Sequence, residues 1–370
     1  LGSPSFFFKA KDFRIKGHAN YGERGILLQY VEFDEMSHGL SNFKAKVIPR
    51  EEGPWEVRVS GHSFDFASKW EEIGAEKETS KNDSRHFPNL SLYLDVDNVW
   101  LTKKNSLTDF SGEFFYNNNR WDKIQIKAKI NGDTSFVMSV EPNMKGDRVL
   151  NITSNNAGQT LQFFDFFGEM LGGELNVTGV YDDSVMDEPL SGFVEIKNFR
   201  VVNTPVLTRM LSILSLTGIL EALEGEGLSF KKLEVPFIFH QNIFRVDSAR
   251  ATGPSLGFTA SGKVQNLTKM IYLEGTIVPA YALNSVFGRL PLLGKLLTGG
   301  EKGGGLFAAN YKLSGLIDNP DVSVNPLSAL TPGILRNVFD IFDGLDESTR
   351  DSKKNGNNVV IIDTAGRLAV

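Results

Sequence analysis

Side chains that could carry acid–base or metal chemistry are present in this chain, but they lie far apart. The histidines are His18, His38, His62, His86 and His240, and none has a glutamate four residues away, the spacing that places two groups on one helix face. Acidic pairs such as Asp95/Asp97 and Asp182/Asp183 fall in predicted turns or on polar strand faces, which favours solvated charge over a glycosidase or metal site. The chain has no cysteine and no Gly-x-Ser-x-Gly sequence, which excludes thiolate ligands and leaves a serine nucleophile unsupported. We therefore predict no enzymatic activity, no metal and no cofactor.

One segment near the C-terminus resembles part of a nucleotide-binding site. Asp363-Thr364-Ala365-Gly366-Arg367 follows a predicted strand and is similar to the switch sequence of signal-recognition-type GTPases. A phosphate-binding loop should precede it. The one candidate has a residue too many between Gly288 and Gly294, and a leucine follows Lys295 where a hydroxyl residue should bind Mg²⁺. We reject nucleotide hydrolysis and interpret the match as coincidence or a foreign tail.

The composition indicates a globular protein with unusual apolar content. Acidic residues outnumber basic ones by 45 to 39, a net charge of −6, which argues against nucleic acid as a partner. The aromatic residues are 28 Phe, 8 Tyr and 4 Trp, and phenylalanine brings apolar area without a polar group. No apolar run reaches the roughly 18 residues of a membrane-spanning helix. We expect this sequence to be a piece of a longer protein, with any membrane anchor outside it, and the Phe excess to line a core or a binding surface.

Alternation of apolar and polar residues predicts strands over most of the chain. The alternation is clear in Leu90–Val96 and Ile124–Ile130, and Leu233–Phe239 continues it up to a Gln241-Asn242 turn. Clusters of Asn, Asp and Gly separate these segments at short intervals, as in consecutive hairpins. Each strand then has one apolar and one polar face. The pattern predicts a mostly β fold built on a long, twisted antiparallel sheet.

Helical segments interrupt the strands at a few places. Residues 160–171 are apolar around most of a helix, and Thr204-Pro205 predicts the start of a second helix over 206–223. Residues 283–297 form a helical segment broken by Pro291, and residues 334–345 have a clear helical period.

Glycines and polar segments divide the chain further. Strands ending in glycine recur at 57–61, 175–179, 258–262 and 311–315, which predicts a bend or a close contact at each glycine. Residues 1–74 and 88–345 are predicted to form the sheet, residues 75–87 a polar linker, and residues 346–370 a flexible tail.

A group of segments, most of them in the second half of the chain, is distinctive. They are Gly275 to Asn284, Leu290 to Leu297, Leu306 to Gly315, Pro320 to Leu330 and Pro332 to Arg336, with Leu190 to Gly192, Asn198 to Leu207 and Ser60 to Asp65 upstream. In these segments the chain resembles the C-terminal region of the AsmA-like family, which includes the TamB-type and YhdP-type envelope proteins. The similarity covers roughly residues 170–342 and is looser before them, and the tail after Leu345 departs from it.

The resemblance implies both a fold and a function. It implies a sheet curled into a U-shaped groove with an apolar inner face, capped or sealed by short apolar helices near its C-terminal end. It also implies phospholipid transport between the inner and outer membranes through the periplasm, without chemistry. The full-length protein would be anchored in the inner membrane by a segment outside this sequence, and its ends would contact the two membranes.

We expect phospholipid acyl chains to contact the apolar faces of strands and helices. The candidates for the groove wall are Leu92, Leu94, Ile124, Ile126, Leu233, Val235, Phe237 and Phe239; those for a plug or a membrane-contacting end are Phe163, Phe164, Phe166, Phe167, Leu211 and Leu214. An ordinary closed core is the alternative role for each of them. The alternative function is an envelope scaffold or outer-membrane assembly factor, whose sheet edge binds an envelope protein partner by strand addition.

Overall fold

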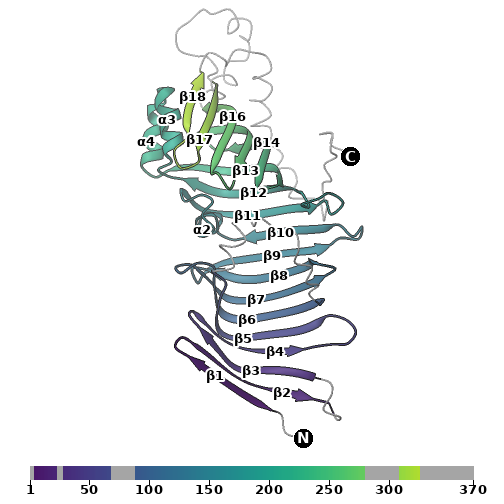
Figure 1. Ribbon diagram of the computed structural model, residues 1–370. Helices are drawn as coiled ribbons and strands as arrows, with labels where there is room; N and C mark the ends of the chain where they lie inside the picture. The colour runs from purple at the N-terminus through teal and green to yellow at the C-terminus, as the bar shows by residue number, and fades with distance from the viewer. Residues whose placement is uncertain (1–3, 23–27, 68–87, 280–307, 326–370) are drawn as a thin grey trace, which may run out of the picture.

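Strands dominate the protein, as predicted. The computed structural model describes residues 4–22, 28–67, 88–279 and 308–325 (Figure 1). Within these residues an 18-stranded sheet is accompanied by three short helices, and the sheet is open rather than closed on itself. The prediction of a mostly β fold with a curled sheet is confirmed.

The strands follow one another along the chain with few interruptions. They are β1 (Ser5–Ala10), β2 (Phe13–Tyr21), β3 (Leu28–His38), β4 (Ser41–Ile48), β5 (Trp55–Asp65), β6 (Leu90–Trp100), β7 (Ser106–Asn117), β8 (Arg120–Ile130), β9 (Thr134–Pro142), β10 (Arg148–Ser154), β11 (Met170–Tyr181), β12 (Leu190–Val201), β13 (Leu228–His240), β14 (Ile243–Thr252), β15 (Leu256–Gln265), β16 (Met270–Pro279), β17 (Ala309–Leu316) and β18 (Asp321–Asn325). The helices are α2 (Ala157–Phe163), α3 (Pro205–Ile213) and α4 (Thr217–Glu224).

Each strand pairs with its neighbours in sequence, so the sheet is a meander. β1 pairs with β2 and β17 pairs with β18, which makes β1 and β18 the two edges of the sheet (Figure 1). The pairs are antiparallel except for one, since β5 and β6 run parallel, from Trp55 opposite Leu90 to Asp65 opposite Trp100. A parallel pair needs a long crossover connection, and the chain between these two strands includes the predicted linker 75–87, which lies outside the described residues.

Bulges and glycines bend the strands and curl the sheet. Asp109 and Ser248 have left-handed backbones, with φ of 48° and 53°, and the pairing register shifts beside each of them. Such bulges bend a strand and increase its twist. Gly61 and Gly262 have φ of 150° and 145°, and a Cβ at Gly262 would lie 2.0 Å from the carbonyl oxygen of Tyr272. The glycines predicted to mark bends or close contacts therefore do so.

The helices differ from the predicted ones in extent. α2 ends at Phe163 rather than Leu171, because Asp165 adopts a left-handed backbone with φ of 56° and the chain then enters β11. The single helix predicted over 206–223 is two helices, α3 and α4, since Ser215 has φ of 55° between them.

Helix α3 begins where the sequence predicts, and no side chain caps its N-terminus. Pro205 is the first helical residue, as predicted. The Thr204 hydroxyl donates to the Val202 carbonyl oxygen over 3.3 Å and makes no hydrogen bond to the helix N-terminus. The other two predicted helices, over 283–297 and 334–345, lie outside the described residues, as do His86, the Gly288–Leu296 stretch, the tail 346–370 and the Asp363–Arg367 sequence.

Candidate functional site: an apolar face along the sheet

The most extensive feature of the protein is a row of apolar residues that crosses the sheet from strand to strand. We call it the Leu92 row. It consists of the directly paired residues Ala19, Val31, Val47, Val57, Leu92, Phe114, Ile124, Val140, Leu150, Gly179, Gly192, Phe237, Val246, Gly262, Leu273, Leu313 and Val322. Directly paired residues project to the same face of a sheet. The row contains no polar side chain from β2 to β18 and, at about 4.8 Å per strand, follows an arc of about 75 Å.

A second apolar row, the Leu94 row, runs beside the first. It joins Phe6, Gly17, Phe33, Ala45, Val59, Leu94, Gly112, Ile126, Met138, Ile152, Val177, Val194 and Val235. The residues between the two rows project to the opposite face, and from β2 to β11 they are His18, Glu32, Lys46, Arg58, Tyr93, Glu113, Gln125, Ser139, Asn151 and Thr178. The sheet therefore has an apolar inner face and a polar outer face along most of its length.

All the strand residues predicted to line the groove lie on the inner face. Leu92, Ile124 and Phe237 belong to the Leu92 row, and Leu94, Ile126 and Val235 to the Leu94 row. Leu233 is directly opposite Ile196 and Phe239 directly opposite Leu190, at even spacing from Phe237 on β13. Phe237 also stacks on Phe244, with ring centroids 4.7 Å apart. Alternation in the sequence placed each residue on the apolar face of its own strand, and the strand pairing joins these faces into one.

The predicted helical candidates separate into different environments. Phe163 is buried and Phe164 half-buried against the inner face of β6 to β9, where Phe164 contacts Phe136 with ring centroids 5.4 Å apart. Phe167 packs beside the cluster around α3 and α4, and Leu211 and Leu214 are buried within it. Phe166 is 70% exposed. The Phe-rich segment is therefore no uniform plug, because the chain reverses at Asp165 and turns Phe166 away from the interior.

Polar contacts fix α2 to the sheet. Its N-cap residue Asn156 accepts a hydrogen bond from the Gln159 backbone N–H over 3.1 Å. The Thr160 hydroxyl donates to the Ser154 hydroxyl over 2.7 Å, and the Thr134 hydroxyl donates to Gln159 Oε1 over 2.6 Å. Since these partners lie on β9 and β10, α2 is held against the inner face as a fixed element.

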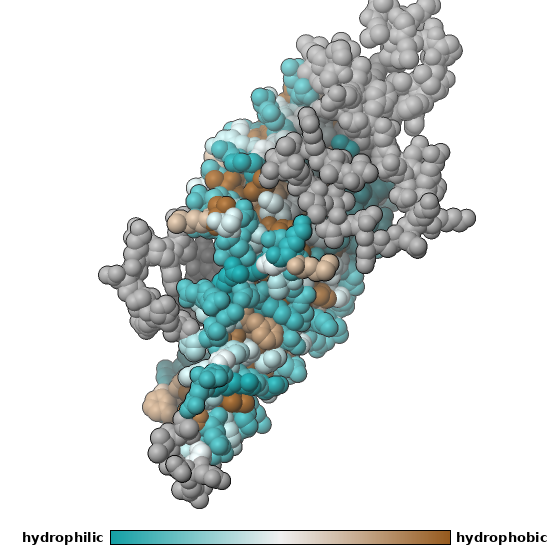
Figure 2. Space-filling view, turned by 90° about the vertical axis from the view of Figure 1, so that its right-hand side faces the viewer, coloured by the Kyte–Doolittle hydropathy of each residue, from teal (hydrophilic) through white to brown (hydrophobic). Residues whose placement is uncertain are grey.

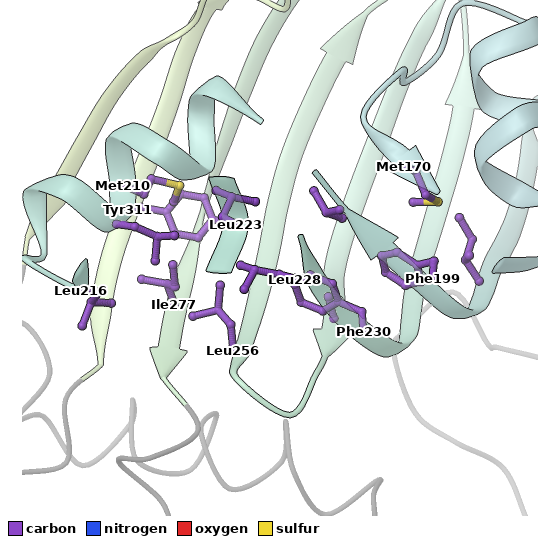
Figure 3. Packing of buried hydrophobic residues seen from close by; sticks show 14 of the residues in the cluster. Met170, Phe199, Met210, Leu216, Leu223, Leu228, Phe230, Leu256, Ile277 and Tyr311 are labelled. Carbon is purple, nitrogen blue, oxygen red and sulfur yellow. The ribbon is translucent and has the colours of Figure 1, made fainter. Parts of the chain in front are cut away.

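Helices α3 and α4 fill the C-terminal part of the curled sheet. Leu211 and Leu223 are fully buried, and they pack with residues of seven successive strands, among them Phe230, Leu256 and Ile277 (Figure 3). Arg209 on α3 donates a hydrogen bond to the Pro320 carbonyl oxygen over 3.0 Å and another to the Asn319 side chain, both in the β17–β18 turn. Beyond β12 the helices therefore cover the part of the inner face that lies toward the β12–β13 connection, whereas Phe237 of the Leu92 row belongs to a separate cluster.

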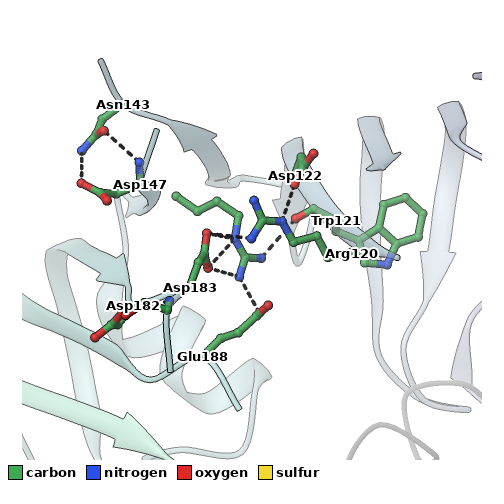
Figure 4. Close-up of polar contacts among 10 residues, drawn as sticks. Arg120, Trp121, Asp122, Asn143, Asp147, Asp182, Asp183 and Glu188 are labelled. Atoms are coloured by element: carbon green, nitrogen blue, oxygen red, sulfur yellow. Dashed lines mark hydrogen bonds and ion pairs between the residues drawn. The ribbon is translucent and has the colours of Figure 1, made fainter. Parts of the chain in front are cut away.

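One polar cluster lies where β8, β10 and β11 end, on the side of the sheet away from the helices. It was not predicted from the sequence. Arg148 is buried, and its guanidinium donates two hydrogen bonds to the Asp183 carboxylate, from Nε over 3.0 Å and from Nη2 over 2.6 Å (Figure 4). Nη2 also donates to the Glu188 carboxylate over 2.5 Å. Arg120 Nη1 lies 3.1 Å from the same Asp183 carboxylate. Asp183 was interpreted as a solvated turn residue, which is wrong, because folding brings it against two guanidinium groups from β8 and β10.

These contacts set the charge states in the cluster. The hydrogen bonds from Arg148 lower the pKa of Asp183 below its ordinary range, and the two carboxylates raise the pKa of Arg148. Tyr181 lies beneath Arg148, with the guanidinium carbon 4.7 Å from its ring centroid. The cluster joins β8, β10 and the β11–β12 loop, so it holds these strand ends together.

Two histidines among the described residues pair with aspartates, His18 with Asp34 and His62 with Asp97. His62 pairs with Asp97 over 2.9 Å on the outer face, where both side chains are well exposed. In the described part of the chain no three His, Asp or Glu side chains are grouped to hold a metal ion. Within the same residues, no helix combines the length and apolarity needed to span a membrane.

Among the described residues, both rows of the inner face consist of apolar side chains and glycines. Comparisons of this chain with protein-family models, with curated proteins and with solved structures find no match.

Proposed function

We propose that this protein carries phospholipid between the inner and outer membranes of a bacterial envelope, with the acyl chains moving along the inner face of the sheet. The observation that carries the proposal is the Leu92 row, which stays apolar across every strand from β2 to β18. An enzyme needs polar groups converging on one place, whereas a conduit needs a uniform surface. The resemblance to the AsmA-like family supports the same proposal, including a periplasmic location.

The energetics favour such a role for an uninterrupted apolar surface. Exposing an acyl chain of about 15 methylenes to water costs roughly 0.8 kcal/mol per methylene, or about 12 kcal/mol in all. Contact with the Leu92 and Leu94 rows removes much of that barrier without a catalytic residue. Apolar residues follow one another along both rows without a polar side chain, so no polar group along them would hold the lipid at one position.

Crosslinking at neighbouring positions of β8 tests the proposal. A photo-crosslinking amino acid replaces Ile126, on the inner face, in one variant and Lys127, on the outer face, in another. Both proteins are purified without detergent from a diderm bacterium and analysed by mass spectrometry. We expect phospholipid to copurify with both and to crosslink at position 126 but not at 127. Absence of copurified phospholipid, or equal crosslinking at both positions, would refute the conduit.

One observation favours the alternative role in envelope assembly. β1 is an edge strand whose every residue is exposed, and Phe7 and Phe8 are 64% and 57% exposed. An exposed apolar edge is a template for strand addition. A proline at Phe7 removes one backbone donor from this edge; in this alternative it abolishes binding of a partner protein while the copurified lipid remains unchanged.

A further inference from the structure

The two long edges of the sheet, formed by the strand ends, differ in chemistry. One edge carries the β10–β11 and β12–β13 connections, residues 155–169 and 202–227, which contain the described helices α2, α3 and α4; we call it the helix rim (Figure 1). The other carries the β9–β10 turn, residues 143–147, and the β11–β12 loop, residues 182–189; we call it the turn rim. The two connections of the helix rim are adjacent, since the Val202 backbone N–H donates to the Glu169 carbonyl oxygen over 2.9 Å.

Large apolar side chains project into solvent on the helix rim. Phe166, in the turn after α2, is 70% exposed; Leu171, at the start of β11, is 52% exposed; and Ile213, at the end of α3, is 51% exposed. These residues follow fixed elements, because α2 is hydrogen-bonded to β9 and β10 and α3 to the β17–β18 turn. Phe166 and Ile213 are therefore held in exposed positions by a rigid support rather than by a frayed loop.

The helix rim carries little charge next to Phe166 and Ile213, whereas Glu169, Arg209, Glu221, Glu224 and Glu226 lie elsewhere on it. From Met210 to Leu220, across the end of α3 and the start of α4, the chain has no charged residue. From Asn155 to Gly168 it has one, Asp165. Charged residues are costly to bring into the interfacial layer of a bilayer, while Phe, Leu and Ile gain from entering it.

The turn rim has exposed apolar residues in a different setting. Met144 and Met186 are fully or almost fully exposed at two neighbouring turns, but Asp147, Asp182 and Asp187 lie close to them in sequence. In the space-filling view of this side, hydrophilic residues cover most of the described surface, and hydrophobic ones form separate patches (Figure 2). The turn rim therefore provides a matched comparison, with similar exposed side chains among acidic neighbours.

At β11 and β12, apolar residues of the inner face and of the helix rim pack into the same cluster. Val177 and Val194, from the Leu94 row, contact both the α3–α4 cluster and the cluster around Phe237, and they are half-buried. Leu161 and Phe167, from α2 and the turn after it, pack against the same α3–α4 cluster. Apolar residues therefore continue from the inner face to the helix rim at β11 and β12, just before α3 and α4 fill the curled sheet.

We propose that the helix rim docks on the surface of a lipid bilayer, with Phe166 and Ile213 entering its interfacial layer. Lipid then passes between the bilayer and the inner face over this rim, next to α2 and α3, rather than through the C-terminal end. The passage of lipid rests on the proposed conduit function, whereas the docking itself does not.

Vesicle flotation of the whole chain tests the docking. The probes are vesicles of phosphatidylcholine alone and vesicles that also contain phosphatidylglycerol. The double variant Phe166→Ser/Ile213→Ser is compared with the turn-rim variant Met144→Ser/Met186→Ser. Burial of one large apolar side chain corresponds to about tenfold in partitioning, so the helix-rim variant should bind at least about tenfold more weakly, while the turn-rim variant should bind like the unmodified protein. All four side chains are exposed, and a thermal unfolding curve confirms that each variant is folded.

Each outcome decides between the proposals. Failure of the unmodified protein to bind vesicles, equal binding by both double variants, or binding that requires phosphatidylglycerol would overturn docking through the helix rim. Mass spectrometry of copurified lipid on the same proteins decides the conduit separately. Lipid without vesicle binding refutes docking and leaves the conduit; vesicle binding without copurified lipid supports docking and refutes the passage of lipid.

Discussion

Removing the Arg148 side chain should destabilise the strands around it, β8, β10 and β11, and leave β2 to β4 unchanged. In Arg148→Met, Asp183 and Glu188 lose the guanidinium between them, while a side chain of similar length still fills the site. Loss of one partner from a buried ion pair costs about 3–5 kcal/mol. The Asp183 side chain is 19% exposed and keeps Arg120 at 3.1 Å. We therefore expect the lower end of that range, about 3 kcal/mol, or about 100-fold in a local equilibrium constant.

Hydrogen exchange measured by mass spectrometry locates this effect. Because each strand of the meander contacts only its neighbours, destabilisation should spread little beyond the affected strands. Exchange should accelerate by about 100-fold in β8, β10 and β11 and remain unchanged in β2 to β4. Arg58→Met is the matched control: its outer-face side chain is 60% exposed and lies 2.6 Å from Glu56, so its loss should cost less than about 1 kcal/mol.

The pH dependence follows from the lowered pKa of Asp183. A carboxyl whose pKa is lower in the folded protein stabilises it at pH values above the unfolded pKa, and that contribution is lost as the pH falls through the folded pKa. The difference between Arg148→Met and the unmodified protein should therefore be full at neutral pH and shrink below about pH 3.9. A uniform acceleration of exchange along the whole sheet, or a change below about tenfold near the mutation, would contradict this account.

Three further predictions concern the curl, the helical cover and a buried hydroxyl. Gly262→Ala should destabilise the protein by about 1–3 kcal/mol in urea unfolding, because φ is 145° and the new Cβ would lie 2.0 Å from a backbone oxygen. Gly218→Ala, in α4, should be neutral or stabilising, since a Cβ there would have no heavy atom within 4 Å. Leu223→Ala should cost about 2–5 kcal/mol and increase exchange in α4, since Leu223 is fully buried; an unchanged midpoint would show that α4 adds no stability. Burial raises the pKa of Tyr311, so its phenolate absorbance should appear only on unfolding, and stability should fall as the pH rises above about 10. Tyr311→Phe should abolish that absorbance step, and ionisation of Tyr311 in the folded protein would contradict the burial.

Alternation along the sequence determined which strand residues face inward. Leu92, Ile124 and Phe237 were each assigned to the apolar face of their own strand from period-two spacing, because neighbouring side chains of a strand must project to opposite sides. The same reasoning identified the glycines that bend or crowd the strands, since L-residues are strained in the conformations or spaces that Gly61 and Gly262 occupy. Local geometry was sufficient for these conclusions.

Tertiary structure decided how those faces combine and which polar groups meet. The continuity of the Leu92 row depends on the register of every strand pair, including the parallel pair β5–β6, which no local pattern predicted. The end of α2 and the exposure of Phe166 depend on a left-handed turn at Asp165, a conformation that aspartate tolerates but that the apolar helical pattern of residues 160–171 did not predict. Arg148 and Asp183 are 35 residues apart in sequence, and they became a buried ion pair because pairing of β10 with β11 brings their ends together. Periodicity determines the face on which a residue lies, whereas contacts between distant segments are selected by the free energy of the whole fold.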